Sequence, residues 1–401
     1  MKKNSNIISI LQLLLIFSIV SCTEPYALQS STYESALVVE AVLTNEAKQH
    51  EVKLTRTFRL DENENENETG AVVKIYGDDG SVYDFAESNG TYKSTITFQA
   101  IPDVKYRLDI ETSNGNNYVS NLETLTTATP LDSITATPVI SNGVSGVEIA
   151  AFSFDPLNTS KYYRYTYEET YKVIVPRWSP NKLTFEDDNT VEISLRDDPE
   201  TRTCYSTNTS NDIIITSTNE LLEDRITNFP IRFIPQDDYS IANRYSILVT
   251  QYVESFDSYN FYRILKSFSN SGNVLSQIQP GFIYGNIQCT NNPNEKVIGI
   301  FNVASVSSKR IFFNYDDIFP GQLFPDYIDV CDIKEFDSSC FGPSCVANGF
   351  FALKSGYLTG KLVYYQNEGV IFKMVKPVCG DCTSFSSNVI PTFWEWKKSF
   401  I

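Results

Sequence analysis

Histidine is almost absent from this chain, methionine is rare, and basic residues are outnumbered by acidic ones. Its 401 residues include one histidine, two methionines, 32 lysines and arginines, and 49 aspartates and glutamates. A single histidine excludes Ser-His-Asp triads, Cys-His pairs and multi-histidine zinc sites, unless His50 itself is used. We interpret His50 as a solvated residue of a polar turn, whose replacement by Gln leaves folding unchanged. The sequence therefore predicts no catalytic residue, no metal site and no cofactor.

The charge balance and the scarcity of long apolar runs limit the partners further. A formal net charge of −17 repels phosphate groups, which disfavours nucleic acid and anionic lipid headgroups. One apolar run, Ile7 to Val20, follows two lysines and is too short to span a bilayer, which is typical of a signal peptide. Ser21-Cys22 comes directly after it, the arrangement that lipoprotein signal peptidase cleaves. We predict a lipoprotein signal peptide over residues 1–21 and acyl chains on Cys22 as the membrane anchor, with an ordinary secretory peptide as the alternative.

Seven cysteines follow Cys22, and an exported chain with so many is expected to form disulfides. Five of them lie in the segment from Cys331 to Cys382, which is rich in Gly, Pro, Ser and Asn. Because five is odd, one must pair outside the segment, and Cys204 is the partner we choose, which leaves Cys289 unpaired. The disulfide candidates are Cys204, Cys331, Cys340, Cys345, Cys379 and Cys382. A zinc site of Cys340, Cys345, Cys379 and Cys382 has possible spacing, but disulfides are favoured in an oxidising compartment.

Aromatic and β-branched residues dominate what is present, with 24 Tyr and 26 Phe. Short alternating apolar segments separated by turn residues predict a mainly β fold, with tandem immunoglobulin-like or transthyretin-like β-sandwiches, one short helix and a disulfide-rich C-terminal region. The predicted parts are a tether (22–35), an N-terminal sandwich (36–127), a larger second sandwich (131–330) with a helix near 257–271, and a Cys-rich cap packed on it (331–401).

A stripe of aromatic residues on one strand and a tryptophan in a turn are the candidates for contact with a ligand. The tyrosines at odd positions from Tyr163 to Tyr171 share one face of a strand and are interpreted as core pairs. Trp178 stands between two prolines, Pro176 and Pro180, and is the best candidate for an exposed contact residue.

Stretches along most of the chain resemble a known family. They include Leu37-Val38-Val39-Glu40-Ala41, Gly285-Asn286-Ile287, Asn292-Pro293-Asn294-Glu295-Lys296, Cys379-Gly380-Asp381-Cys382-Thr383 and Pro391-Thr392-Phe393-Trp394. In this order they resemble a family of exported Bacteroidota lipoproteins known as domain of unknown function 4249. The resemblance implies an outer-membrane lipoprotein often encoded beside a TonB-dependent receptor, and it supplies no catalytic residues. Cys289 departs from the family's pattern, which also marks it as the free thiol candidate. Asp132-Ser133-Ile134 resembles the short O-glycosylation acceptor of that lineage, with Ser133 as the acceptor.

The sequence leaves three functions open. The leading expectation is a non-enzymatic outer-membrane lipoprotein, an accessory or ligand-binding partner of a TonB-dependent transporter. A carboxylate-dependent, glycosidase-like hydrolase is the main alternative, and it needs two acids about 5 to 10 Å apart in a cleft. A surface adhesin is the third, and it requires that the lipoprotein faces outward. Glu24 stands alone after Cys22 instead of in an acidic run, so the sequence does not specify periplasmic or surface orientation.

Overall fold

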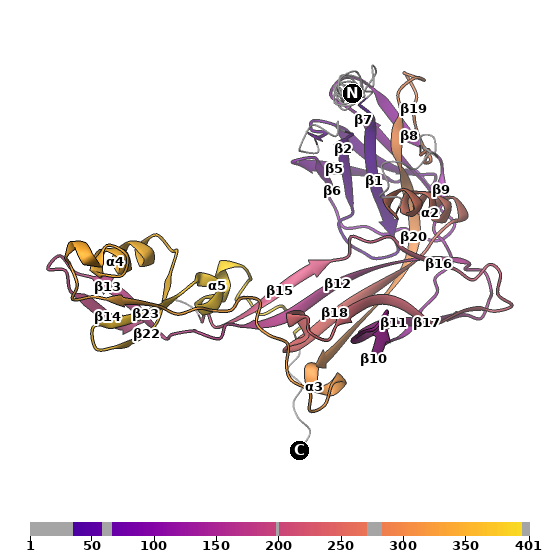
Figure 1. Cartoon of the computed structure of the whole chain (residues 1–401). Coiled ribbons are helices and arrows are strands. Elements are labelled where there is room, and N and C mark those ends of the chain that lie inside the picture. Colours follow the sequence, from indigo (N-terminus) through magenta and orange to yellow (C-terminus); the bar gives the residue numbers. More distant parts are fainter. Residues whose placement is uncertain (1–34, 58–65, 198–199, 271–282, 395–401) are drawn as a thin grey trace, which may run out of the picture.

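The computed structural model describes residues 35–57, 66–197, 200–270 and 283–394, and every structural statement below concerns these ranges. Cys22 lies outside them. The chain is mainly β, as predicted, with one 15-stranded sheet, three smaller sheets and a few short helices. Figure 1 shows two β-sandwiches set at an angle and an arm that extends from the second one. No helix in this part of the chain has both the length and the apolar character needed to cross a membrane.

The first sandwich is formed by the predicted alternating segments. Its strands are β1 (Leu37–Thr44), β2 (Glu51–Arg56), β3 (Glu66–Asn67), β4 (Val72–Gly77), β5 (Val82–Ser88), β6 (Thr91–Ser94), β7 (Lys105–Glu111), β8 (Asn117–Ser120) and β9 (Glu123–Thr124). In β7, Tyr106, Leu108 and Ile110 are buried while the residues between them are not, because alternate side chains point to opposite faces of a strand. β5 pairs with β4 on one side and with β6 on the other, and so joins the two halves of the sandwich.

A single long strand, β20 (Val297–Asn314), belongs to both sandwiches. Its first part pairs in parallel with β1, from Val297 opposite Leu37 to Ala304 opposite Thr44. Its second part pairs antiparallel with β18 (Arg244–Val253). The short β19 (Ile287–Cys289) adds to β8, and Ile287, Val297 and Phe301 enter the first core. The prediction assigned residues 283–304 to the second sandwich, whereas strand pairing places them in the first.

A glycine lets the parallel pair approach closely. Gly299 has φ +144°, and a Cβ built on it would lie 2.1 Å from the carbonyl oxygen of Val39. Any other residue would clash with the β1 backbone, so this position requires glycine.

The second sandwich packs a three-stranded sheet against the continuation of the large one. The three-stranded sheet contains β10 (Leu131–Ser141), β11 (Val144–Asp155) and β17 (Asp224–Pro235). The part of the large sheet that faces it contains β12 (Tyr162–Ile174), β15 (Thr203–Thr209), β16 (Ile214–Ser217), β18 and the end of β20. Tyr163, Tyr165 and Tyr167 of β12 face the core between them, which confirms the core interpretation of that stripe. Two short helices, η1 (Tyr239–Ile241) and α3 (Tyr315–Ile318), lie at its edge.

The arm combines two stretches that are far apart in the sequence. It contains β13 (Asn181–Phe185), β14 (Val191–Leu195), β21 (Lys334–Asp337), η2 (Pro343–Cys345), α4 (Phe350–Leu358), β22 (Val363–Glu368) and β23 (Ile371–Val375), and α5 (Pro377–Gly380) and η3 (Cys382–Ser384) lead back from it. Leu183, Phe336, Leu353 and Met374 share its core. The predicted cap therefore does not pack on the second sandwich along its whole length. Residues 334–375 have a core of their own because the β13–β14 hairpin supplies the missing apolar surface.

Candidate functional sites

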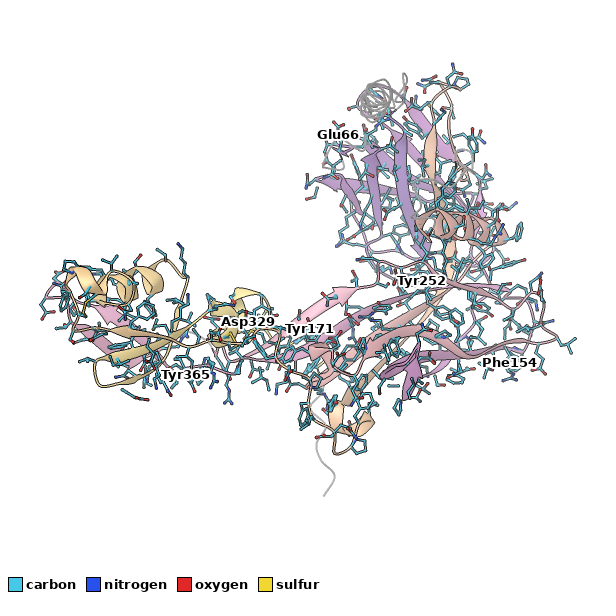
Figure 2. All side chains as sticks on the ribbon, in the orientation of Figure 1. Glu66, Phe154, Tyr171, Tyr252, Asp329 and Tyr365 are labelled. Atoms are coloured by element: carbon cyan, nitrogen blue, oxygen red, sulfur yellow. A yellow bond between two sulfur atoms is a disulfide. The ribbon has the colours of Figure 1, made fainter. Side chains whose placement is uncertain are left out.

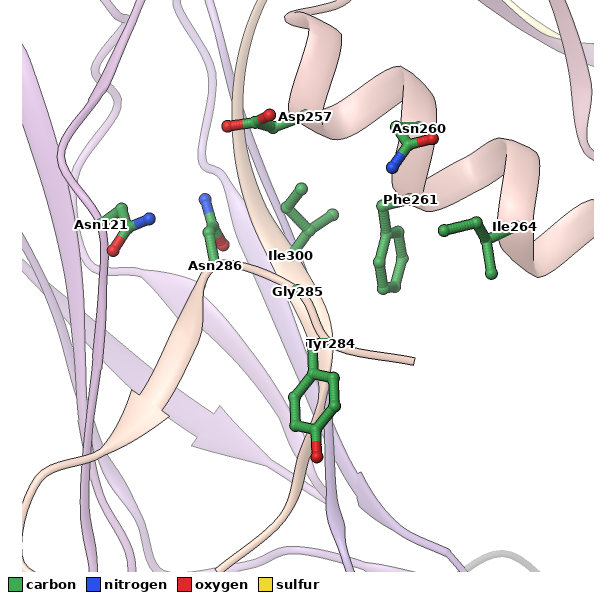
Figure 3. A pocket seen from close by; sticks show the side chains of 9 residues that line it. All are labelled: Asn121, Asp257, Asn260, Phe261, Ile264, Tyr284, Gly285, Asn286 and Ile300. Carbon is green, nitrogen blue, oxygen red and sulfur yellow. The ribbon is translucent and has the colours of Figure 1, made fainter. Parts of the chain in front are cut away.

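A small polar pocket lies where the predicted helix crosses the first sandwich. The helix is α2 (Phe256–Asn270), and the Oγ atom of Ser255 accepts a hydrogen bond from the backbone N–H of Ser258 (3.1 Å) at its start. Phe261 is buried on its inner face. The pocket has a volume of about 200 Å³ and is lined by Asn121, Asp257, Asn260, Phe261, Ile264, Tyr284, Gly285, Asn286 and Ile300 (Figure 3).

Two carboxyl groups lie near this pocket, but only Asp257 lines it. Burial raises the pKa of Glu123, and the nearby negative charge of Asp257 raises it further. The side-chain amide of Asn286 donates to Glu123 (2.7 Å) and to the Phe301 carbonyl (2.8 Å). Because Asn286 holds Glu123 in place behind the lining, the pocket offers hydrogen-bonding groups to a ligand rather than two facing carboxylates.

The segment that links α3 to the arm exposes large apolar side chains. We call residues 319–333 the elbow segment. In it Leu323 is 92% exposed and Val330 85%, and Phe324 and Ile328 are also more than half exposed. Tyr327 anchors the segment, with its ring 4.9 Å from that of Tyr239. Exposed apolar groups in such number are typical of a contact surface.

Two of the hollows that adjoin the elbow segment lie next to its exposed apolar residues. One, of about 310 Å³, is lined by Phe324, Arg244 and Lys172 among others. The other, of about 380 Å³, is lined by Tyr327, Asp329 and Val330 among others. Figure 2 places Asp329 between the arm and the second sandwich, where its carboxylate pairs with Lys376 (2.7 Å). This pair lowers the pKa of Asp329, so the carboxylate is charged at neutral pH.

Six cysteines form three disulfides near the elbow and in the arm. Cys204 is bonded to Cys382, Cys331 to Cys379 and Cys340 to Cys345, while Cys289 is free. These are the six candidates and the one free thiol that the sequence analysis named. The four cysteines of the alternative zinc site belong to three different disulfides, so they do not form one site. Asp329 lies near the sulfur atoms of Cys331 and Cys379, but two sulfurs bonded to each other offer no thiolate to a metal.

Trp178 is not the exposed contact residue that the sequence predicted. Its side chain is half-buried against Val173 and Cys382, and its Nε1–H donates to the Oγ1 atom of Thr201 (3.1 Å). The sequence did not identify the exposed apolar residues of the elbow segment as a contact surface. The alternation of side chains within one strand does not show which loop remains uncovered in the folded chain. Ser133 is exposed on β10, so its hydroxyl is accessible, and the intact mass of native protein would test the predicted glycan.

The interpretation of His50 as a solvated residue of a polar turn is also wrong. It lies just before β2, its side chain is only 2% exposed, and its ring lies edge-on to Phe98 at 4.8 Å. Its Nε2 atom is 3.0 Å from the Phe98 carbonyl oxygen. The turn is polar in sequence, but the first sandwich folds over it, so His50→Gln is no longer expected to be neutral.

We expect His50 to make stability depend on pH below neutrality. Burial, together with the charge of Lys48, lowers the pKa of His50 below its ordinary value of 6.5. The unfolded chain then binds the proton more readily, so the stabilisation is complete above pH 6.5 and is lost as the pH falls through the folded pKa. In urea unfolding, the wild-type chain should therefore lose more stability than His50→Gln between about pH 7 and pH 5. Parallel stability curves for the two chains would contradict this expectation.

Comparisons with known proteins identify a family for this chain. A search of the curated proteins found no significant match. Among solved structures, the trypsin-activated alpha-2-macroglobulin of Escherichia coli is similar at 8% identity and a TM-score of 0.18, over 56% of this chain and 15% of that much longer one, which supports no further argument. The family model described as "Domain of unknown function (DUF4249)" matches residues 23–310. Because this match covers most of the sequence, the chain belongs to the DUF4249 family.

Proposed function

We propose that this chain is a lipid-anchored, non-enzymatic outer-membrane lipoprotein that binds a TonB-dependent transporter of a Bacteroidota cell as its accessory partner. The signal sequence that ends at Cys22 supports the anchor, and the resemblance of the sequence to exported lipoproteins supports the location. The elbow segment is the observation that carries the proposal for a protein partner. Leu323 and Val330 are almost fully exposed there, which costs free energy in water unless another surface covers them.

The elbow segment rests on a rigid support, which suits a binding surface. Cys331 within it is bonded to Cys379, and the bond between Cys204 and Cys382 ties the chain beyond the arm to β15. The long β20 holds the two sandwiches together. A pre-ordered surface loses little conformational entropy when a partner binds, so fewer contacts are needed for a given affinity.

The test is capture of the lipidated protein from its own membrane, followed by identification of co-purified transporters by mass spectrometry. The variant Leu323→Ser/Val330→Ser should reduce the recovered transporter about tenfold, since each lost apolar contact weakens binding. The matched control is Leu157→Ser/Leu222→Ser, which removes similarly exposed apolar residues from loops of the second sandwich. Equal recovery with both double variants would contradict the elbow as the binding surface. Normal acyl labelling of Cys22→Ala would contradict the anchor.

A carboxylate-dependent hydrolase is kept as the second candidate function because of the groups at the pocket beside α2. Asp257 lines the pocket, and Glu123, whose pKa is raised by burial, lies near it, but its hydrogen bond from Asn286 would have to break before it could act on a substrate. Incubation of the protein with a panel of oligosaccharides would test it, with Glu123→Gln and Asp257→Asn as inactive controls. Hydrolysis that survives both substitutions would exclude these residues.

A further inference from the structure

The end of the arm carries an apolar surface of its own, distinct from the elbow segment. We call Phe341, Val346, Phe351 and Leu358 the arm tip. Phe351 is 61% exposed and Leu358 64%, and Val346 is exposed further still. Phe351 and Leu358 are seven residues apart on α4 and so lie on one face of the helix. The opposite face is buried, with Phe350 and Leu353 in the arm core, so α4 is apolar on both sides.

A disulfide holds the second half of this surface in place. Cys340 and Cys345 close a short loop from which Phe341 projects. The Phe341 ring lies 5.1 Å from that of Phe350 and 6.1 Å from that of Phe351, so loop and helix form one surface. The loop packs closely on the start of α4, since a Cβ on Gly349 would lie 2.4 Å from the Cys340 carbonyl oxygen. The phenyl rings are thus presented by a rigid frame.

The charge around the arm tip differs from that of the rest of the molecule. Although the whole chain has a net charge of −17, residues 338–367 contain no Asp or Glu, and their charged residues are Lys354 and Lys361. The neighbouring acids are Asp337, whose backbone N–H donates to the Asn348 carbonyl (2.8 Å), and Glu186, which follows Phe185, whose ring contacts those of Phe350 and Tyr357. No carboxylate from residues 338–367 would have to lose its water if the arm tip entered an apolar phase.

From this arrangement we propose that the arm tip inserts into the surface of the lipid bilayer to which the protein is anchored. Phenylalanine and leucine side chains enter the boundary between headgroups and acyl chains. Lys361 extends its ammonium group toward the headgroups, and Lys354, whose Nζ atom lies 5.8 Å from the centre of the Phe350 ring, turns toward them on insertion. The unfavourable charge of the whole chain acts weakly here, since charges beyond about 8 to 10 Å are screened at physiological ionic strength.

A bilayer fits this surface better than a protein partner does. The arm tip lies in a stretch with two lysines and no carboxylate, whereas the elbow segment, which we assign to a protein partner, contains Asp326, Asp329 and Asp332 beside its apolar residues. A small contact is sufficient when an anchor already holds the molecule at the membrane, because the second contact is then intramolecular. The inference therefore rests on the lipid anchoring in the proposed function, and it assigns the arm a place on the same bilayer.

Quenching by brominated lipids tests the insertion. The lipidated full-length protein carrying Phe351→Trp is incorporated into phosphatidylcholine nanodiscs with or without bromine on the acyl chains. Bromine quenches indole emission only at short range, so the added emission should fall at least twofold in brominated discs. The matched control is Leu222→Trp, at an exposed apolar position of the second sandwich, whose added emission should not change. The unsubstituted chain supplies the background from its three native tryptophans.

The possible outcomes separate the insertion of the arm tip from the lipid anchoring of the chain. Equal emission of Phe351→Trp in both kinds of disc would overturn insertion of the arm tip while leaving the anchor intact. Equal quenching of both variants would also overturn it, because the contact would not be specific to the arm. A chain that fails to co-elute with the discs would overturn the lipid anchoring itself, and with it the inference.

Discussion

Replacing Glu254 with Gln should lower the free energy of unfolding by about 3 to 5 kcal/mol, the range found when one partner of a buried ion pair is removed. The Glu254 carboxylate pairs with the Nε atom of Arg164 at 2.7 Å, and the two side chains are 0% and 10% exposed. The Arg164 guanidinium also lies over the rings of Tyr252 (4.0 Å) and Tyr262 (4.6 Å). Figure 2 shows Tyr252 where the two sandwiches meet. The substitution leaves a buried cation without its counter-charge, and arginine cannot lose its proton to escape this cost.

The same pair joins several elements, which is why the loss should be large. Glu254 accepts a hydrogen bond from Asn302 of β20, and Asn302 in turn accepts one from Ser258 of α2 (3.1 Å). β12, β20, α2 and the residue that follows β18 therefore share one buried polar network. Partly satisfied networks of this kind cost more than their pairwise contacts suggest.

Urea unfolding followed by circular dichroism measures the effect. The matched control is Asp84→Asn, which breaks the exposed pair between Asp84 and Lys74 (3.0 Å) and should cost less than about 1 kcal/mol. The double variant Arg164→Met/Glu254→Gln should recover much of the loss, since no charge then remains buried. A Glu254→Gln chain as stable as the Asp84→Asn control would show that the pair contributes little.

Removing the disulfide between Cys204 and Cys382 should have the second large effect. The two cysteines are 178 residues apart, and closing a loop of that length restricts the unfolded chain by roughly 5 kcal/mol in the chain-entropy model. The bond lies beside residues 385–394, which we call the tail. In this segment the Trp394 ring contacts Tyr205 (4.9 Å), and the Ser387 carbonyl accepts a hydrogen bond from the Tyr205 backbone N–H (2.7 Å). We expect Cys204→Ser/Cys382→Ser to release the tail from β15 as well as to lower global stability.

A second disulfide provides the control. Cys340 and Cys345 are five residues apart, and the same model assigns their loop only about 2 kcal/mol. Cys340→Ser/Cys345→Ser should therefore shift the urea midpoint less. Limited proteolysis should cut the tail only in the variant that lacks the Cys204–Cys382 bond. Equal midpoints and equal cleavage in both variants would be evidence against the long-range tie.

Local patterns were sufficient for the elements themselves. Alternating side chains predicted strands such as β7, and the helix predicted near 257–271 is α2 (Phe256–Asn270). The aromatic stripe of β12 was assigned to the core. These features depend on neighbours in sequence, because a strand repeats every two residues and a helix about every 3.6. The set of disulfide cysteines and the family were also contained in the sequence alone, and export stays a prediction.

Only the tertiary structure decided which elements meet. Alternation tells which face of a strand is buried but not which strand lies beside it, so the dual pairing of β20 could not be foreseen. The burial of His50 and Trp178 and the joining of residues 181–195 to the arm are further results of contacts between distant segments. The exposed surfaces of the elbow segment and the arm tip follow from the same cause. A side chain is left uncovered when no other part of the chain reaches it, and that depends on the whole fold rather than on the residue's own neighbours in sequence.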